Sequence, residues 1–151
     1  MGDSVSSELR RLLDEGKITR FHASPMMVEK EVKAASDDLK TAEESLARED
    51  IKWATVQGYY AFFHAVKALA YRKGYREKSH RALLTALEEL YIKDRRVQRR
   101  HLDALRNAMN LRESADYGMT YSRDGAKAIV SDAKKFLEVV DAILNQPKNT
   151  A

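Results

Sequence analysis

WATVQGYYAFFHAVKALAY, residues Trp53–Tyr71, is the stretch that decides the fold class, because it is apolar over most of a helical circumference. With successive residues about 100° apart on a helix, one broad face collects apolar and aromatic side chains. They are Val56, Tyr59, Phe62, Phe63, Val66, Leu69 and Ala70. A helix this apolar is expected at the centre of a bundle, with other helices packed around it.

Amphipathic helices are predicted on both sides of this segment. Ser24 and Pro25 form a favourable helix start, after which apolar residues recur at spacings of three and four. Asp50 is expected to cap the central helix, and Ser79 the helix that follows it. A last helix is expected from about Asp124 to Leu144, and no period-two strand or hairpin turn is evident. The sequence therefore predicts an all-α, up-and-down helical bundle of about five helices plus a short N-terminal helix.

Length and composition indicate one domain. The chain has 151 residues, of which 44% are hydrophobic and 33% charged, and it has no cysteine. We expect residues 1–26 to form an N-terminal helix and connector, residues 27–145 the bundle, and residues 146–151 a flexible tail. Neither a secretory signal nor a membrane-spanning segment is evident, so we expect a cytoplasmic protein with no membrane contact.

A polar and aromatic stripe runs along the other side of the central helix. It consists of Trp53, Gln57, Tyr60, His64, Lys67 and Tyr71, at spacings of four and three. Flat aromatic surface interleaved with hydrogen-bonding groups could line a ligand site or a helical interface. The alternative is a partly exposed face with amphipathic aromatic residues, and periodicity alone favours that alternative.

Two of the four histidines are candidates for a functional role. His64 lies on the stripe, while His80 follows Lys78 at a predicted helix N-terminus, where backbone N–H groups favour an anion such as phosphate. The alternative for the second position is an ordinary helix cap. No histidine has a partner at a metal-site spacing, so the sequence predicts neither a metal site nor a cofactor.

The excess positive charge is concentrated between Lys93 and Arg100, in KDRRVQRR. Five basic residues and one acidic residue give this segment the whole chain's net charge of +4. The basic residues are Lys93, Arg95, Arg96, Arg99 and Arg100. We expect the cluster to open a helix and to be able to contact phosphates, although most such clusters are solvated and this one lacks interleaved aromatic residues.

The segment NLRESADYG, residues 110–118, carries the strongest polar anchor. On a helix, Arg112 and Asp116 lie four residues apart on one face, with Tyr117 beside them. By itself this is an ordinary pair that contributes a few tenths of a kcal/mol when exposed, about 0.3–0.5 kcal/mol.

The order of three segments gives a more specific indication. GYYAFFHAVKALAYRKGYREKSHRAL, residues 58–83, followed by NLRESADYG, resembles the prokaryotic branch of the HEPN family, which carries Y-Y-A-x-F-H-A, K-x-H and R-x-x-A-D-Y segments. The resemblance implies a helical bundle, a homodimer, and a small nucleotidyltransferase partner acting as antitoxin in a toxin–antitoxin module. It also implies that many members are metal-independent ribonucleases, with an arginine followed four to six residues later by a histidine.

The chain departs from that pattern at the histidine. Arg112 matches the arginine, but Tyr117 stands five residues later and no histidine follows His101. Cleavage of RNA without metal needs a base, an acid and a cation, and a tyrosine phenol is a poor base at neutral pH. His64 or His80 would therefore have to complete a catalytic set with Arg112.

Three functions remain open: a nucleotide- or RNA-binding partner of a nucleotidyltransferase, a divergent ribonuclease toxin, and a non-catalytic helical dimer. The missing histidine favours the first. The predicted ligand-binding residues are Arg112, Asp116, Tyr117, Tyr60, His64, Lys67, Lys78 and His80.

Overall fold

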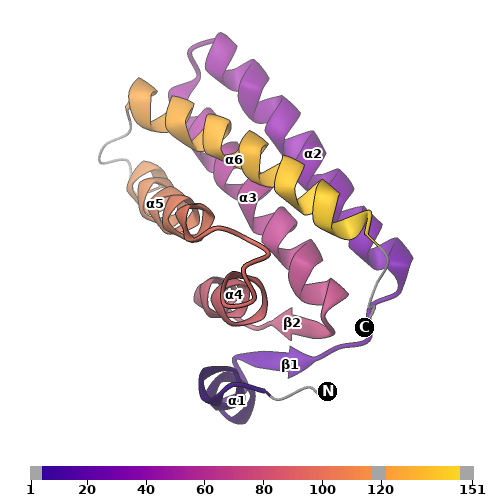
Figure 1. The fold of residues 1–151 in the computed structure, drawn as a ribbon. Helices are drawn as coiled ribbons and strands as arrows, with labels where there is room; N and C mark the ends of the chain where they lie inside the picture. Colours follow the sequence, from indigo (N-terminus) through magenta and orange to yellow (C-terminus); the bar gives the residue numbers. More distant parts are fainter. Residues whose placement is uncertain (1–4, 117–121, 147–151) are drawn as a thin grey trace.

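The computed structural model describes residues 5–116 and 122–146, apart from the side chains of residues 115 and 116. Within these ranges the helices are α1 Ser7–Asp14, α2 Pro25–Ala47, α3 Ile51–Arg72, α4 His80–Leu87, α5 Arg99–Asp116 and α6 Arg123–Leu144 (Figure 1). A π-helical segment, Glu88–Ile92, continues α4, and two short strands are β1 Ile18–Arg20 and β2 Tyr75–Glu77. The predicted all-α bundle with a short N-terminal helix is confirmed. No helix in these ranges combines the length and apolar composition that crossing a membrane requires.

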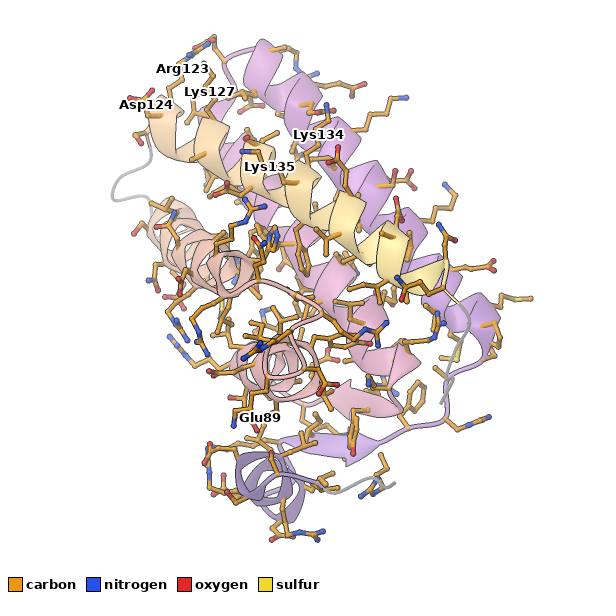
Figure 2. All side chains as sticks on the ribbon, viewed as in Figure 1. Glu89, Arg123, Asp124, Lys127, Lys134 and Lys135 are labelled. Atoms are coloured by element: carbon orange, nitrogen blue, oxygen red, sulfur yellow. The ribbon has the colours of Figure 1, made fainter. Side chains whose placement is uncertain are left out.

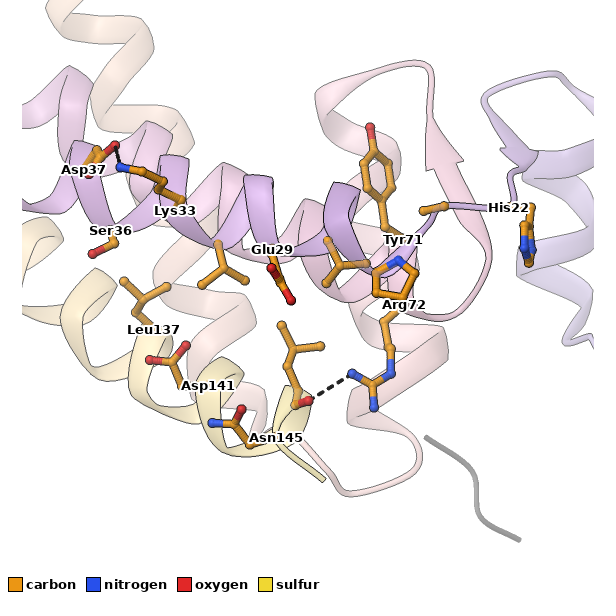
Figure 3. Close-up of a pocket in the computed structure, with 15 residues that line it drawn as sticks. His22, Glu29, Lys33, Ser36, Asp37, Tyr71, Arg72, Leu137, Asp141 and Asn145 are labelled. Carbon is orange, nitrogen blue, oxygen red and sulfur yellow. Dashed lines mark hydrogen bonds and ion pairs between the residues drawn. The ribbon is translucent and has the colours of Figure 1, made fainter. Parts of the chain in front are cut away.

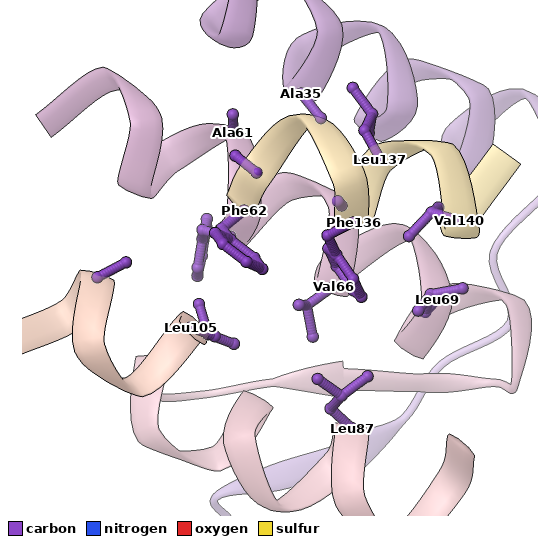
Figure 4. Close-up of a cluster of buried hydrophobic side chains, with 14 of the residues drawn as sticks. Ala35, Ala61, Phe62, Val66, Leu69, Leu87, Leu105, Phe136, Leu137 and Val140 are labelled. Atoms are coloured by element: carbon purple, nitrogen blue, oxygen red, sulfur yellow. The ribbon is translucent and has the colours of Figure 1, made fainter. Parts of the chain in front are cut away.

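Helix α3 is the centre of the bundle, as its apolar face predicts. It packs against α2 and α6 along its length and against α4 and α5 on another side (Figure 1). All seven side chains of the predicted apolar face are buried. Phe62 stacks on Phe136 of α6, with ring centroids 5.1 Å apart, inside the main hydrophobic cluster (Figure 4). Burial of these rings, together with the other side chains of the cluster, stabilises the bundle.

The contact between α3 and α6 depends on Gly58. A Cβ at this position would lie 2.7 Å from Cγ2 of Ile129, closer than two carbon atoms approach without displacement. The absence of a side chain therefore lets the two backbones approach one another at this point.

Serine residues begin the helices where the sequence predicts. The side chain of Ser24 accepts a hydrogen bond from the Met27 amide at 3.2 Å, and that of Ser79 accepts one from the Ala82 amide at 3.1 Å. Asp50 precedes α3 as expected, but its side chain makes no capping hydrogen bond, so that part of the prediction is wrong. Gly74 ends the turn after α3 with φ of +91°, which a glycine adopts without strain.

The expectation that the chain has no strand is wrong. β1 and β2 pair in antiparallel fashion, with Ile18 opposite Glu77 and Arg20 opposite Tyr75. The backbone N–H of Lys78 also donates to the carbonyl of Lys17 at 2.8 Å. Each strand has three residues, too few to show a period-two pattern, and the partners lie far apart in the sequence. This pairing attaches α1 and β1 to the start of α4, where a second buried cluster includes Leu9, Leu12, Ile18, Tyr75, Ala82 and Ala86.

Candidate functional site

Arg112 lies near the end of α5, over two tyrosines of α3. Its Nη2 donates to the Tyr60 hydroxyl at 3.0 Å. The guanidinium carbon lies 5.5 Å from the ring centroid of Tyr59 and 5.4 Å from that of Tyr60. Contacts with both rings restrict the orientation of a planar guanidinium group. The bundle thus holds a half-buried cation in a defined position.

His80 is the first residue of α4 and contacts Tyr59, one of these two tyrosines, and Phe63. Its Nδ1 lies 2.7 Å from the hydroxyl of Tyr59, so one of the two groups donates to the other according to the imidazole tautomer. Burial lowers the pKa of His80, the positive charge of Arg112 lowers it further, and Glu77 acts in the opposite direction. Burial also raises the pKa of Tyr59 well above its ordinary value, so its phenol stays neutral. His80 is therefore a neutral imidazole at pH 7, and its Nε2 makes no hydrogen bond with any described residue.

These two groups line one pocket of about 360 Å³. Its walls are Lys17, Tyr59, Ser79, His80, Arg81, Met109, Arg112 and Glu113. Three side chains are cationic and one is a carboxylate, and Arg81 lies 4.0 Å from that carboxylate across an exposed ion pair. The volume is within the range of small-ligand pockets, roughly 300–1,000 Å³. An anion is the ligand that this set of groups can best accommodate.

His64, the other candidate histidine, is not part of this pocket. Its Nδ1 lies 2.7 Å from a carboxylate oxygen of Glu31, and its Nε2 lies 3.7 Å from one of Asp38, both on α2. Burial raises the pKa of Glu31, but the hydrogen bond with His64 and the nearby charge of Lys67 outweigh burial, so this pKa is lowered overall. Of the two histidines, the structure brings only His80 to the pocket with Arg112.

Two predicted lysines also lie outside the pocket lining. The ammonium of Lys67 is 3.7 Å from a carboxylate oxygen of Glu77. Lys78 is exposed, and its backbone N–H donates to the carbonyl of Lys17, directly before β1. Asp116 is the last residue of α5, and its side chain lies outside the described part of the chain, as does Tyr117. Their predicted roles stay predictions.

Comparison with known proteins identifies the bundle. The model of the HEPN domain matches residues 28–143, most of the chain. The chain belongs to the HEPN family. The predicted boundaries at residues 27 and 145 are not tested by this match and stay a prediction.

Three known proteins are similar in sequence to this chain. A UPF0332 protein of Archaeoglobus fulgidus is 34% identical over 58% of this chain and 71% of its own length. Two proteins of Methanocaldococcus jannaschii, each named "putative toxin", are 29% and 22% identical. Their alignments cover 62% and 76% of this chain, and 63% and 87% of the respective relatives. The resemblance to the HEPN family that the sequence motifs indicate is confirmed.

Lys17 is the pocket residue that the sequence analysis missed most completely. Lys17 precedes the matched HEPN region and lies next to β1 in the sequence. Because β1 pairs with β2, and β2 ends two residues before Ser79, Lys17 lies at the pocket. No local pattern around Lys17 could have indicated this contact, since it depends on long-range pairing. Arg81 and Glu113 were also missed, although each neighbours a predicted residue in the sequence, which was the available signal.

The basic cluster is distributed differently from the prediction. Only Arg99 and Arg100 lie in α5, while Lys93, Arg95 and Arg96 lie in the turn before it. The π-helical segment delays the start of the new helix. Lys93 pairs with Glu89 at 2.9 Å, and Arg99 pairs with Glu88 at 2.6 Å, so part of the charge is compensated within the HEPN domain.

Other cations of the domain lie on α6, far from Glu89 (Figure 2). Arg123, Lys127 and Lys134 line a shallow hollow beside the end of α2, and Arg123 pairs with Glu49 at 3.0 Å. They take no part in the pocket around Arg112. Among the described residues, no three histidine, aspartate or glutamate side chains cluster closely enough to hold a metal ion.

Proposed function

We propose that the pocket around Arg112 binds the phosphate of a nucleotide or of RNA, and that the protein acts as the binding partner of a minimal nucleotidyltransferase in a toxin–antitoxin-like module. The observation that carries this proposal is the convergence of Arg112, Lys17 and Arg81 on a pocket with a single carboxylate. His80, at the start of α4, adds a hydrogen-bonding group.

The geometry of Arg112 and the size of the pocket support binding of a ligand that carries a phosphate. Its guanidinium group is oriented by two rings and the Tyr60 hydroxyl before any ligand arrives, which lowers the entropy cost of binding. A pocket of about 360 Å³ also leaves room for more than one charged group. A phosphate carrying a nucleoside, or one in an RNA backbone, fits both features.

Direct binding measurements test the proposal. Arg112→Ala should weaken the affinity for AMP, ATP or a short single-stranded RNA about tenfold to a hundredfold, because it removes a charged hydrogen-bond donor. Arg106→Ala is the matched control, since Arg106 is an exposed arginine of the same helix that does not line the pocket. Equal affinities for the wild type and Arg112→Ala, or no binding of any of the three probes, would contradict the proposal.

A metal-independent ribonuclease is the second candidate, favoured by the presence of neutral His80 beside Arg112. The unprotonated ring nitrogen of His80 would take the proton of the 2′-hydroxyl, whose oxygen attacks the phosphorus as the bond to the 5′-oxygen breaks. Arg112 would stabilise the charge of the phosphorane, and the leaving 5′-oxygen would take a proton from protonated His80 or from water. The test is incubation of the protein with RNA in EDTA. Cleavage that disappears in both His80→Gln and Arg112→Ala, but persists in Arg106→Ala, would establish this activity. Intact RNA in every sample would leave binding as the function.

The toxin–antitoxin part of the proposal is supported by the family and by the names of two relatives. Two relatives carry toxin names, and the motif resemblance implies a homodimer with a nucleotidyltransferase as antitoxin. Light scattering on the purified protein tests the dimer, and a monomeric mass at micromolar concentration would argue against it. Co-expression with a small nucleotidyltransferase encoded beside the gene tests the partner, and separate elution of the two chains would contradict the pairing.

A further inference from the structure

The surroundings of Tyr59 determine the direction of its hydrogen bond with His80. Tyr59 is buried, with 1% of its surface exposed, and its hydroxyl lies 2.7 Å from Nδ1 of His80. Among the described residues, this nitrogen is the only hydrogen-bond partner of the hydroxyl. A buried O–H needs an acceptor, because an unsatisfied buried donor costs more free energy than a typical hydrogen bond contributes.

Only one direction of the bond satisfies the hydroxyl. If Nδ1 carried a proton and donated it to the phenol oxygen, the phenol O–H would have no acceptor among the described residues. If the phenol donates instead, Nδ1 is the acceptor, and the proton of the neutral ring lies on Nε2. The phenol keeps its proton for this bond at neutral pH, because burial raises the pKa of Tyr59. The lone pairs of the phenol oxygen then remain near the positive charge of Arg112, whose guanidinium carbon lies 5.5 Å from the ring centroid.

The imidazole of His80 is held by a second aromatic neighbour as well. The ring centroid of Phe63 lies 4.3 Å from that of His80, with the two planes inclined at 40°. Since the lone-pair directions of the two imidazole nitrogens diverge, Nε2 is directed away from Tyr59. It makes no hydrogen bond with any described residue, and His80 lines the same pocket as Arg112. A proton on Nε2 is therefore available to a ligand in that pocket.

We propose that Tyr59 is a positioning residue: its hydroxyl holds neutral His80 as the Nε2–H tautomer, so that the imidazole donates a hydrogen bond to a phosphate oxygen in the pocket. The ligand part of this assignment rests on the proposed function. An ionised phosphate offers only acceptor oxygens, so it is attracted by an N–H group and meets a lone pair at an unprotonated nitrogen. With Nδ1 bonded to Tyr59 and Nε2 protonated, neither nitrogen of the neutral ring is free to act as a base. The arrangement favours binding of RNA over its cleavage.

Nuclear magnetic resonance of isotope-labelled histidine nitrogens measures the tautomer directly. At about pH 8, above the ordinary pKa of histidine, the ring is neutral and its protonated and unprotonated nitrogens have different chemical shifts. We expect a protonated Nε2 and an unprotonated Nδ1 in wild-type His80, whose signals are identified by their absence from His80→Gln. A predominantly protonated Nδ1 would overturn the inference, whether or not the protein binds a nucleotide.

Tyr59→Phe keeps the aromatic ring and removes only the hydroxyl. It should increase the population of His80 with a proton on Nδ1, and should weaken the affinity for AMP about threefold to tenfold in a calorimetric titration. Tyr91→Phe is the matched control. Tyr91 is equally buried, its hydroxyl donates to the carbonyl of Leu69 at 2.7 Å, and it does not line the pocket. This control should change neither the tautomer nor the affinity.

The two measurements separate the role of Tyr59 from the proposed function. Wild-type protein that does not bind AMP would contradict the phosphate pocket, while its His80 spectrum would still decide the tautomer. An unchanged tautomer in folded Tyr59→Phe would overturn the role of Tyr59. An altered tautomer with unchanged AMP affinity would show that Nε2 does not donate to the phosphate. Circular dichroism checks the folding of both variants, and the wild-type spectrum decides the tautomer if Tyr59→Phe does not fold.

Discussion

The two sides of α3 differ in the charged side chains that line their hollows. On the side of α4 and α5, Arg112 is held by tyrosine rings and projects into a pocket with further cations. On the side of α2 and α6, a larger hollow is lined by charges of both signs (Figure 3): Lys33 pairs with Asp37, Arg72 donates to backbone carbonyls, and Glu29 and Asp141 form no ion pair with a described residue. One helix thus separates a pocket with an excess of cationic side chains from a hollow lined by charges of both signs. The pocket has three cations and one carboxylate in its lining, whereas the hollow has two cations and three carboxylates.

Loss of the shared core should destabilise the whole bundle, including the pocket around Arg112. Phe62→Ala deletes a fully buried ring stacked on Phe136, and should lower the free energy of unfolding by about 3–5 kcal/mol. Urea denaturation monitored by circular dichroism measures this change. Nucleotide binding should fail at the same urea concentration, and its survival in unfolded protein would contradict a pocket held by this core.

Lower pH should raise the affinity of the pocket around Arg112 for a phosphate-containing ligand. Because the pKa of His80 is lowered on folding, the unfolded chain binds the proton first, and the free energy of unfolding falls as pH drops below about 6.5. A bound phosphodiester favours the charged imidazole, so affinity for a short RNA should rise about fivefold as His80 protonates. Anisotropy at several pH values measures this, because phosphodiesters do not titrate in the range. His80→Gln should flatten the profile, and an unchanged slope in that variant would exclude His80 as its source.

Lys17, in the N-terminal segment, should contribute less to nucleotide affinity than Arg112. Lys17→Ala removes a partly exposed cation, and should weaken nucleotide binding about twofold to fivefold. Calorimetric titration measures the change. Arg10→Ala removes an exposed charge from the same segment outside the pocket lining, and should leave the affinity unchanged. Equal effects of the two substitutions would mean that only overall charge matters.

The smallest effect on stability should be at Arg81. Its ion pair with Glu113 is exposed and long, at 4.0 Å, so Arg81→Ala should change the free energy of unfolding by less than about 0.5 kcal/mol. Thermal unfolding checks this value. A loss of nucleotide affinity without a loss of stability would assign Arg81 to binding, while a loss of both would assign it to the fold.

The helical core could be predicted because it depends on local periodicity. Every residue of the expected apolar face of α3, from Val56 to Ala70, is buried. The serine caps were predicted for the same reason, since a cap needs only the next three residues. The polar stripe of α3 was harder, because its residues bond to different neighbours: His64 to α2, Tyr60 to α5 and Lys67 to β2.

The composition of the pocket could be predicted only in part. Arg112 was indicated by its spacing from Asp116 and His80 by its place at a predicted helix N-terminus, and the motif resemblance supported both. The choice between His64 and His80 required the packing of α2 and α4 around α3. Tyr59 was assigned to the core, and it is buried, yet its hydroxyl bonds to His80. The hollow between α2 and α6 was not predicted, since it forms between two helices about 100 residues apart in the sequence.

The pairing of β1 with β2 has a consequence for exchange of backbone hydrogens with solvent. The Lys78 amide bonds to the carbonyl of Lys17, so that amide exchanges only when the N-terminal segment detaches from the start of α4. An anion held by both Lys17 and Arg112 would oppose that detachment. Its binding would then be recorded as slower deuterium uptake at Lys78, a residue that does not line the pocket.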